Sequence, residues 1–382
     1  MQSQQTPLVI VCTTSYLPMV GGAELAIYHI AKRIPTMRFL VLTARQSRSV
    51  PAREVSDNIE IHRLGLGFSW DRWMLPLYIS IRRIPSHAVL WGMMISQGTI
   101  GAYILKRRYP ALSFVVTLQE GDSENYIEYG RGGLISYWWK RVLGIADEVV
   151  VISSYLTDRA KHAGFHGLIT LIPNGVDEHF VSEAMEQRDE TELRELHGIS
   201  SEDRIVLSVS RLVEKNGLTD LLRAHALVRQ KGIQVKLVLV GDGPERGLLR
   251  ALARDLECAD SIIFAGTVDH DRILDYYRIA DIFVRPSLSE GLGSAFLEAM
   301  GVGVPVVATS VGGIKDFLRD GETGVVVRPR DVNNIAAGII QILEDDALKA
   351  RIQTRARELV VTQYLWIDIA QQMKMVFERA LL

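Results

Sequence analysis

The chain has 382 residues, of which 48% are hydrophobic and 23% charged, a composition typical of a soluble globular protein with two ordinary domains. The net charge of −2 gives no indication of nucleic-acid binding. Cys12 and Cys258 form neither a metal-ligand spacing nor a disulfide framework, and neither a signal peptide nor a transmembrane run is recognisable, so we expect a cytoplasmic protein.

Short apolar runs typical of buried strands alternate with longer amphipathic stretches typical of helices. The first series of strands is predicted at 8–12, 39–43, 59–64, 88–91, 114–118 and 148–152, with a helix over 21–33. A polar stretch at 182–204 follows. The second series is predicted at 205–210, 235–240, 261–265, 282–286, 304–308 and 324–327, with helices over 217–230 and from 331 to the end.

Continuous β-branched runs separated by helices indicate parallel sheets that are covered on both faces. The sequence therefore predicts an α/β protein of two doubly wound, Rossmann-like domains that face each other across a cleft. We place the first domain at residues 1–182 and the second at 183–363. Ligands of such sheets bind at the carboxyl ends of the strands, so a site at the cleft is expected.

The most informative segment is 286–300, which follows a predicted strand. Glu290 and Glu298 lie on either side of a small-residue turn, and Gly293 and Ser294 leave backbone N–H groups uncovered where a helix is predicted to begin. A helix start attracts anions, and two neighbouring carboxylates suit hydroxyl groups. The segment therefore indicates a nucleotide-sugar site. The alternative is that Glu290 is only a carboxylate favoured by the helix dipole.

Two cations and two glycines also follow predicted strands. Arg211 and Lys215 come directly after the strand at 205–210, where they would neutralise a diphosphate; the alternative is two solvated surface cations. Gly21 and Gly22 allow a close backbone approach to a ligand, or else form a plain tight turn.

Together these segments resemble the retaining glycosyltransferase family 4, whose members have the two-domain GT-B architecture. The resemblance covers nearly the whole chain. The motifs that carry it are Gly21-Gly22-Ala23-Glu24, the turn Ile172-Pro173-Asn174-Gly175-Val176-Asp177, Arg211-Leu212-Val213-Glu214-Lys215, Gly241-Asp242-Gly243-Pro244, Glu290 to Met300, and Val311-Gly312-Gly313.

The resemblance implies a retaining glycosyltransferase that moves a hexose-type sugar from a nucleoside-diphosphate sugar to a glycan or lipid-linked acceptor, in polysaccharide, lipopolysaccharide or glycolipid biosynthesis. It implies no cofactor besides the donor substrate. No Asp-x-Asp motif occupies a matching position, so we expect no metal. The helix at 364–382 would complete the first domain.

The resemblance also implies individual roles. Arg211 and Lys215 would hold the diphosphate, with Gly21 and Gly22 approaching it, and Glu290 would hold the transferred sugar. The other implied donor contacts are Glu298 for the ribose, the backbone at Leu292, Gly293, Ser294 and Ala295, Gly241, and Thr267 and Val268 beside the base.

The sequence departs from the family at Gln119, where many members carry a histidine. Glutamine cannot act as a general base near neutral pH. Either Gln119, Glu120 or Asp122 positions the acceptor while the departing phosphate takes its proton, or the protein is a non-catalytic nucleotide-sugar-binding protein. A GT-B epimerase or phosphorylase is a further alternative. A dinucleotide oxidoreductase is disfavoured, because no G-x-G-x-x-G follows the first strand.

Three segments mix aromatic and basic residues, namely 70–83, 106–109 and 138–141. Such segments suit a lipid interface, which predicts peripheral contact with the inner face of the cell membrane. The alternative is that these aromatic residues belong to the core and the acceptor cleft. The motifs do not distinguish the nucleotide base, the sugar, the acceptor or the oligomeric state.

Overall fold

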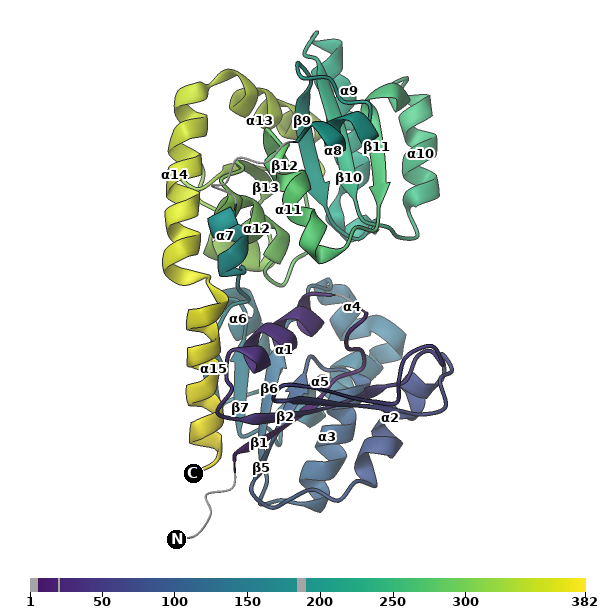
Figure 1. Cartoon of the computed structure of the whole chain (residues 1–382), viewed down its shortest axis with the longest axis vertical. Helices are drawn as coiled ribbons and strands as arrows, with labels where there is room; N and C mark the ends of the chain where they lie inside the picture. The colour runs from purple at the N-terminus through teal and green to yellow at the C-terminus, as the bar shows by residue number, and fades with distance from the viewer. Residues whose placement is uncertain (1–5, 20, 184–189) are drawn as a thin grey trace. The chain divides into compact units, whose positions relative to one another are not determined.

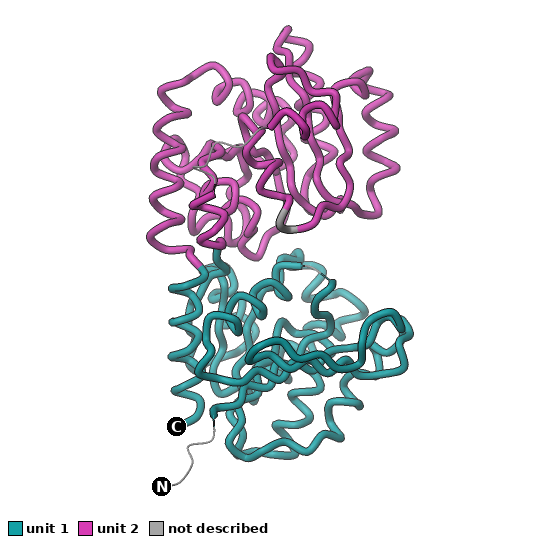
Figure 2. The backbone as a smooth tube through the Cα atoms, viewed as in Figure 1, with its two compact units in different colours: residues 1–175, 366–382 teal, residues 176–365 magenta. Residues whose placement is uncertain are grey.

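A computed structural model describes residues 6–19, 21–183 and 190–382. The chain divides into two compact units (Figures 1 and 2). Unit 1 comprises Met1–Gly175 with Trp366–Leu382, and unit 2 comprises Val176–Leu365. Each is built on a mainly parallel sheet covered by helices, so the predicted fold class is confirmed for each unit.

Unit 1 is built on an eight-stranded sheet in the order β3-β4-β2-β1-β5-β6-β7-β8. Its strands are β1 (Leu8–Cys12), β2 (Arg38–Ala44), β3 (Arg53–Ser56), β4 (Ile59–Leu64), β5 (Ala88–Met93), β6 (Ser113–Leu118), β7 (Glu148–Val151) and β8 (Leu168–Leu171). Its helices are α1 (Gly22–Lys32), α2 (Asp71–Ser80), α3 (Gln97–Arg108), α4 (Glu124–Tyr129), η1 (Gly130–Gly133), α5 (Leu134–Leu143), α6 (Ser154–His162) and α15 (Trp366–Ala380).

The central strands of unit 1 are buried on both faces. Val9 and Val11 of β1 pack in one hydrophobic cluster with α1 and α15, and α2 and α3 pack against each other and against β4 and β5 (Figure 1). Phe377 of α15 meets the rings of Phe39 and Trp91, with centroids 5.9 and 5.1 Å away. Because both faces are covered, the strands read as continuous apolar runs, which is why the sequence predicts them well.

One strand of unit 1 departs from the predicted parallel pattern. β3 pairs antiparallel with β4, through a tight turn at Asp57 with φ 51°. All four residues of β3 are exposed, so the strand carries no burial pattern that sequence reasoning could detect. Antiparallel edge strands of this kind are common on otherwise parallel sheets.

Unit 2 is built on a six-stranded, wholly parallel sheet in the order β11-β10-β9-β12-β13-β14. Its strands are β9 (Arg204–Val209), β10 (Val235–Val240), β11 (Ile262–Gly266), β12 (Ile282–Arg285), β13 (Val306–Thr309) and β14 (Val325–Val327). Its main helices are α7 (Glu178–Glu183), α8 (Thr191–Leu196), α9 (Leu218–Gln230), α10 (Arg246–Asp255), α11 (His270–Arg278), α12 (Ser294–Val302), α13 (Val332–Glu344) and α14 (Asp346–Gln363). The sheet and helices α9 and α13 share one hydrophobic core.

The first boundary between the units lies before the predicted one, so residues 176–182 belong to unit 2. The N–H group of Val176 donates to the Tyr364 carbonyl at 2.7 Å, and Phe180 and Val181 of α7 are buried. Polar residues surround the segment in the sequence, which conceals these contacts. The last helix begins at Trp366 and belongs to unit 1.

Candidate functional site

The predicted site residues of unit 2 follow four neighbouring strands, β11, β10, β9 and β12, at the carboxyl edge of the sheet. Arg211 and Lys215 lie in the loop after β9. The Lys215 carbonyl accepts the Leu288 N–H at 2.7 Å, and the buried Asn216 donates its side-chain N–H to the Arg211 carbonyl at 2.6 Å. The loop that carries the two cations is therefore held at both of its cationic positions.

Two glycines allow these loops to pack backbone against backbone. Gly217 has φ 68°, and a Cβ added there would lie 2.1 Å from the Pro286 carbonyl oxygen. Gly241 has φ 125°, and its added Cβ would lie 2.1 Å from the Ser210 carbonyl oxygen. Neither position accepts a side chain, because both the conformation and the space exclude one.

The start of α12 has the predicted form. Gly293 precedes the helix with φ 91°, and a glycine cap offers no side-chain oxygen to the N–H groups of Ser294 and Ala295. The preceding Leu292 is buried, which anchors the turn in the core. The helix start therefore presents backbone donors and the positive end of the dipole to a ligand.

Glu290 is held by an arginine that the sequence analysis did not identify. The Arg285 guanidinium donates to Glu290 Oε1 at 2.6 Å and to the Val209 carbonyl at 3.0 Å. The side chains of Arg285 and Glu290 are only 6% and 13% exposed, and the guanidinium lies 4.2 Å from the centre of the Phe296 ring. The signal in the sequence is an arginine inside an otherwise apolar strand.

Glu298 lies one turn into α12 and has a phenol partner. The Tyr277 hydroxyl is shared between Glu298 Oε2 at 2.9 Å and the Ala295 carbonyl at 3.1 Å. Burial raises the pKa of Tyr277 well above its ordinary value, and the Glu298 charge adds to the effect. The hydroxyl therefore stays protonated and donates to the carboxylate.

Thr267 and Val268 complete the edge of unit 2. They follow β11, and the Gly241 N–H donates to the Gly266 carbonyl at 2.7 Å, which joins the turns after β10 and β11. All the predicted residues of unit 2 therefore gather at one edge of its sheet.

The predicted residues of unit 1 gather in the same way, after β1 and β6. Gly21 and Gly22 begin α1. Gln119 accepts a hydrogen bond from the side chain of the buried Asn174 at 3.1 Å, and a Cβ added to Gly22 would lie 4.0 Å from the same Asn174 nitrogen. Asn174 is therefore more than the turn residue that its sequence context indicates, because it orients Gln119.

Glu120 and Asp122 differ in their surroundings. Glu120 is buried and accepts the N–H groups of Ile95 at 2.5 Å and Gln119 at 2.9 Å, so it connects the loops after β5 and β6. Burial raises the pKa of Glu120 to about 7, although those N–H groups oppose the rise. Asp122 is half-buried and lies one residue before the cap of α4.

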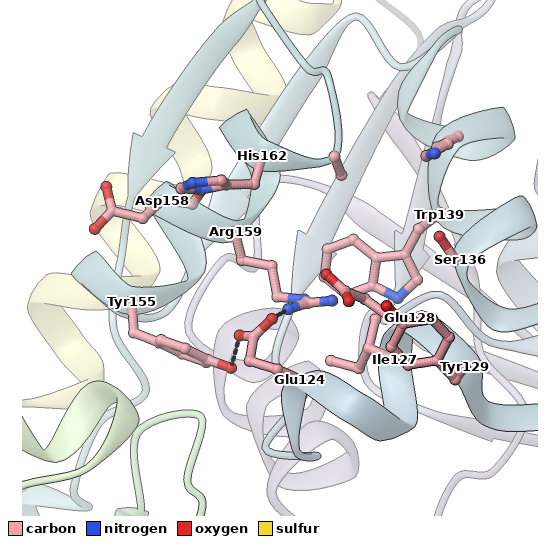
Figure 3. A pocket seen from close by; sticks show the side chains of 12 residues that line it. Glu124, Ile127, Glu128, Tyr129, Ser136, Trp139, Tyr155, Asp158, Arg159 and His162 are labelled. Atoms are coloured by element: carbon pink, nitrogen blue, oxygen red, sulfur yellow. Dashed lines mark hydrogen bonds and ion pairs between the residues drawn. The ribbon is translucent and has the colours of Figure 1, made fainter. Parts of the chain in front are cut away.

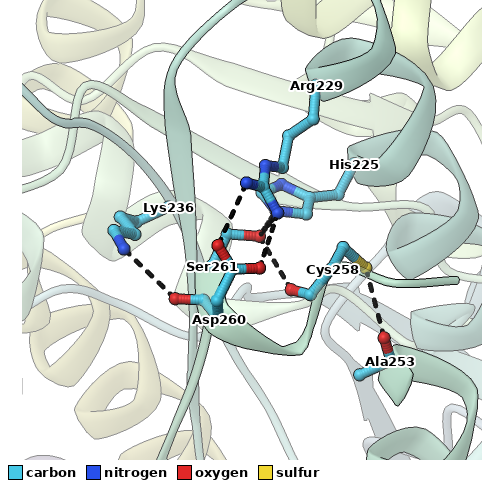
Figure 4. Close-up of polar contacts among 7 residues, drawn as sticks. All are labelled: His225, Arg229, Lys236, Ala253, Cys258, Asp260 and Ser261. Carbon is cyan, nitrogen blue, oxygen red and sulfur yellow. Dashed lines mark hydrogen bonds and ion pairs between the residues drawn. The ribbon is translucent and has the colours of Figure 1, made fainter.

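A second cluster of titratable groups lies at the amino-terminal end of the unit 2 sheet (Figure 4). Ser261 Oγ lies 2.8 Å from His225 Nε2 and accepts from Arg229 at 3.0 Å, while Arg229 also forms two hydrogen bonds with Asp260. Burial lowers the pKa of His225 to about 3. The cluster connects α9 to the segment before β11, and its place opposite the predicted site indicates a structural role.

Of the three aromatic and basic segments, residues 70–83 expose the most apolar surface. Trp73 and Leu77 of α2 are 51% and 52% exposed. By contrast, Lys106 donates to Asp147 at 2.8 Å, and Trp139 is buried. In the described part of the chain, no helix is both long and apolar enough to cross a membrane. Those same residues contain no cluster of three histidine, cysteine or acidic side chains placed to hold a metal.

Two family profiles together match most of the chain. The profile of the glycosyl transferases group 1 matches residues 189–359, and that of glycosyltransferase family 4 matches residues 20–180. The chain belongs to glycosyltransferase family 4. The family predicted from the motifs is therefore confirmed.

Curated relatives support this membership over part of their length. The N-acetyl-alpha-D-glucosaminyl L-malate synthase of Bacillus anthracis is 32% identical over 50% of this chain and 49% of its own. The GDP-mannose-dependent alpha-(1-6)-phosphatidylinositol monomannoside mannosyltransferase of Mycobacterium tuberculosis is 32% identical over 61% of this chain and 62% of its own. The matches thus span about half to three-fifths of these relatives.

Solved structures confirm the GT-B fold. Sucrose-phosphate synthase from Thermosynechococcus elongatus has a TM-score of 0.84 and 22% identity, over 98% of this chain and 99% of its own. Anabaena HepE, solved in complex with UDP and glucose, has a TM-score of 0.78 and 21% identity over the same shares.

Proposed function

We propose that this family 4 member is a retaining glycosyltransferase that transfers a hexose-type sugar from a nucleoside-diphosphate sugar to a glycan or lipid-linked acceptor. The observation that carries the proposal is made at the carboxyl edge of the unit 2 sheet. There the loop with Arg211 and Lys215, held by hydrogen bonds, lies beside the start of α12, where Glu290 and Glu298 are each held by a partner side chain. Similar proteins support the proposal, since HepE was solved with UDP and glucose and the mycobacterial enzyme depends on GDP-mannose.

Each group at this edge suits one part of such a donor. Arg211, Lys215 and the N–H groups that begin α12 neutralise the diphosphate, and they stabilise the charge that develops on it as the sugar leaves. Glu298, held by Tyr277, accepts the ribose hydroxyls. Glu290, held by Arg285, accepts hydroxyls of the transferred sugar.

The reaction in this proposal needs no protein base. The acceptor oxygen bonds to the anomeric carbon on the face from which the diphosphate departs, and the acceptor proton passes to the departing diphosphate oxygen. Gln119, oriented by Asn174, contributes an amide that positions substrate. The two fixed cations supply the positive charge that a metal would otherwise provide.

Nucleotide binding tests the donor site. In a thermal-shift screen without metal, UDP, GDP or ADP at ~100 times its dissociation constant should stabilise the protein by about 2.7 kcal/mol. Lys215→Ala should abolish the shift and reduce turnover by more than tenfold, whereas Lys231→Ala, which changes an exposed lysine of unit 2, should leave both unchanged. Turnover of Lys215→Ala within a few-fold of the wild-type value would overturn the assignment.

The anomeric configuration of the product tests retention. Proton NMR of the first product formed from an α-configured donor should show an α linkage. A β linkage would rule out same-face attack.

Gln119 favours one second candidate, a nucleotide-sugar-binding protein without transferase activity. It predicts a thermal shift with a nucleotide but no transfer or hydrolysis of the matching nucleotide sugar. A Gln119→His variant that gains activity would support this alternative.

We also propose peripheral membrane contact through α2. Trp73 and Leu77 of α2 and the flanking Trp70 and Ile81 expose apolar surface. The segment 70–83 also carries three arginines, which suits an anionic lipid surface. Trp73→Ser with Leu77→Ser should abolish sedimentation with vesicles of phosphatidylglycerol and phosphatidylcholine at low salt. Leu248→Ser, at a similarly exposed leucine of unit 2, is the control. Equal binding of all proteins would refute the contact.

A further inference from the structure

Unit 1 contains a pocket of about 540 Å³ between α4, α5 and α6 (Figure 3). Trp139 and Ile127, both 2% exposed, form its apolar part. Glu124, Tyr155 and Arg159 contribute polar groups from α4 and α6. Of these side chains, only Trp139 lies in a segment with a predicted role, the aromatic and basic segment 138–141.

The pocket opens beside the predicted residues of unit 1. α4 begins shortly after Asp122, and α6 follows β7, so Glu124 and Tyr155 lie at the carboxyl edge of the sheet. Burial raises the pKa of Tyr155, and the charge of Asp122 raises it further. Burial lowers the pKa of Arg159, against the opposing charge of Glu120. The pocket is therefore within electrostatic reach of both predicted carboxylates.

Hydrogen bonds and an ion pair fix the polar side chains of the pocket relative to one another (Figure 3). The Tyr155 hydroxyl donates to Glu124 Oε1 at 2.5 Å, and Arg159 forms an ion pair with Glu124. The Arg159 guanidinium lies 5.4 Å from the centre of the Trp139 ring. Its side chain is 10% exposed, and its Nε has no hydrogen-bond partner within the described residues. A buried donor of this kind is costly unless a ligand or water accepts from it.

The lining favours an uncharged, hydroxyl-rich ligand over an anion. Three carboxylates, Glu124, Glu128 and Asp158, exceed the two fixed cations, Lys140 and Arg159. Carboxylates accept hydrogen bonds from hydroxyl groups, and the exposed ring of Tyr129, which also lines the pocket, offers apolar surface to the C–H face of a sugar ring. A bare phosphate would face an excess of negative charge.

We propose that this pocket binds the terminal sugar of the acceptor as a neutral hexose, an inference that rests on the proposed transferase function. The segment that joins α4 to α5 also connects the pocket to α2, because the Arg131 guanidinium lies 5.0 Å from the centre of the Trp73 ring. In this proposal the lipid of the acceptor lies at the exposed face of α2, and its terminal sugar enters the pocket.

Octyl glycosides below their micellar concentration test the site on the full chain. Octyl glucoside, galactoside, mannoside and N-acetylglucosaminide are compared by saturation-transfer NMR, which detects binding without turnover. Glu124→Gln and Tyr155→Phe keep the side-chain volumes while removing a charge and a hydroxyl. Tyr137→Phe, at an exposed tyrosine of α5 outside the pocket, is the matched control.

We expect at least one glycoside to bind the wild-type protein, and Glu124→Gln to raise its dissociation constant at least tenfold, as expected for a hydrogen bond to a charged group. Tyr155→Phe should raise it severalfold and Tyr137→Phe not at all, while the nucleotide thermal shift stays unchanged in all three. The proposal is overturned if no glycoside binds the wild-type protein, or if both pocket variants bind like the control. If the wild-type protein shows no thermal shift with UDP, GDP or ADP, the proposed function is refuted instead.

Discussion

Replacing Arg285 by methionine should destabilise unit 2 strongly. The substitution keeps an apolar chain in place but removes the donors to Glu290 and to the Val209 carbonyl. The Glu290 carboxylate, 13% exposed, then remains buried without its cation. Most of the loss in stability therefore comes from the buried Glu290 charge that is left unpaired, rather than from the lost hydrogen bonds themselves.

The magnitude follows from the burial of the pair. Breaking a buried ion pair from one side costs about 3–5 kcal/mol. A domain of this size loses roughly 2–4 °C in Tm for each kcal/mol, so the expected decrease is on the order of 6–20 °C. Arg246→Met breaks an ion pair of similar length, 2.9 Å, whose side chains are 38% and 45% exposed. Exposed pairs contribute about 1 kcal/mol or less, so this variant should change little.

The distribution of tryptophan permits each unit to be followed separately. All six tryptophans belong to unit 1, so their fluorescence reports its unfolding, whereas far-UV circular dichroism follows both units. In urea titrations, Arg285→Met should shift the part of the dichroism transition that fluorescence does not follow.

The double variant Arg285→Met with Glu290→Gln separates the cost of an unpaired buried charge from the cost of lost packing. Removing both charges should restore most of the lost stability, with a coupling energy of at least about 1.5 kcal/mol. Additive losses in the double variant, or a loss below about 1 kcal/mol in Arg285→Met, would refute the reasoning.

Gly217→Ala should prevent stable folding of unit 2, because the added Cβ would collide with the Pro286 carbonyl oxygen. Gly232→Ala is the control: this glycine also has positive φ but open space around it, so the variant should lose only about 1 kcal/mol of unfolding free energy. Equal urea midpoints of the two variants would contradict the steric argument. The pKa of His225 is lowered by burial from 6.5 to about 3, so between these values the unfolded chain binds a proton that the folded chain does not. Stability should therefore fall by about 1.36 kcal/mol for each pH unit as the pH decreases through this range. His225→Gln should flatten that slope in urea titrations at pH 6 and 5, and an unchanged slope would argue against a neutral buried His225. Asn174→Ala removes the hydrogen-bond partner of Gln119. It should lower the initial rate of sugar transfer up to about tenfold, as expected for the loss of one hydrogen bond, while nucleotide binding stays unchanged. An unaffected transfer rate would mean that Gln119 does not depend on Asn174.

Much of the fold could be predicted, because its parallel strands are buried on both faces. The β9, β10 and β12 runs are mainly apolar, and the structure places them within a residue or so of the predicted positions. The exposed strand β3 could not be found in this way. The boundary at Val176 was equally inaccessible, because it depends on hydrogen bonding to Tyr364, far away in the sequence.

Four features could be read directly along the chain: the succession of strands and helices, the glycines that follow strands, the spacing of Glu290 and Glu298, and the glutamine at position 119. The strands and glycines follow from local rules, namely the succession of short apolar runs and longer amphipathic stretches and the backbone conformations that only glycine adopts easily.

The partners that hold those residues become visible only in the folded chain. Tyr277 meets Glu298, Asn174 meets Gln119, and the pocket between α4, α5 and α6 forms, because packing and the order of strands bring distant segments together. The physical reason is that a hydrogen bond or ion pair depends on atoms within about 3 Å, and which atoms those are is settled by packing rather than by any pattern along the chain.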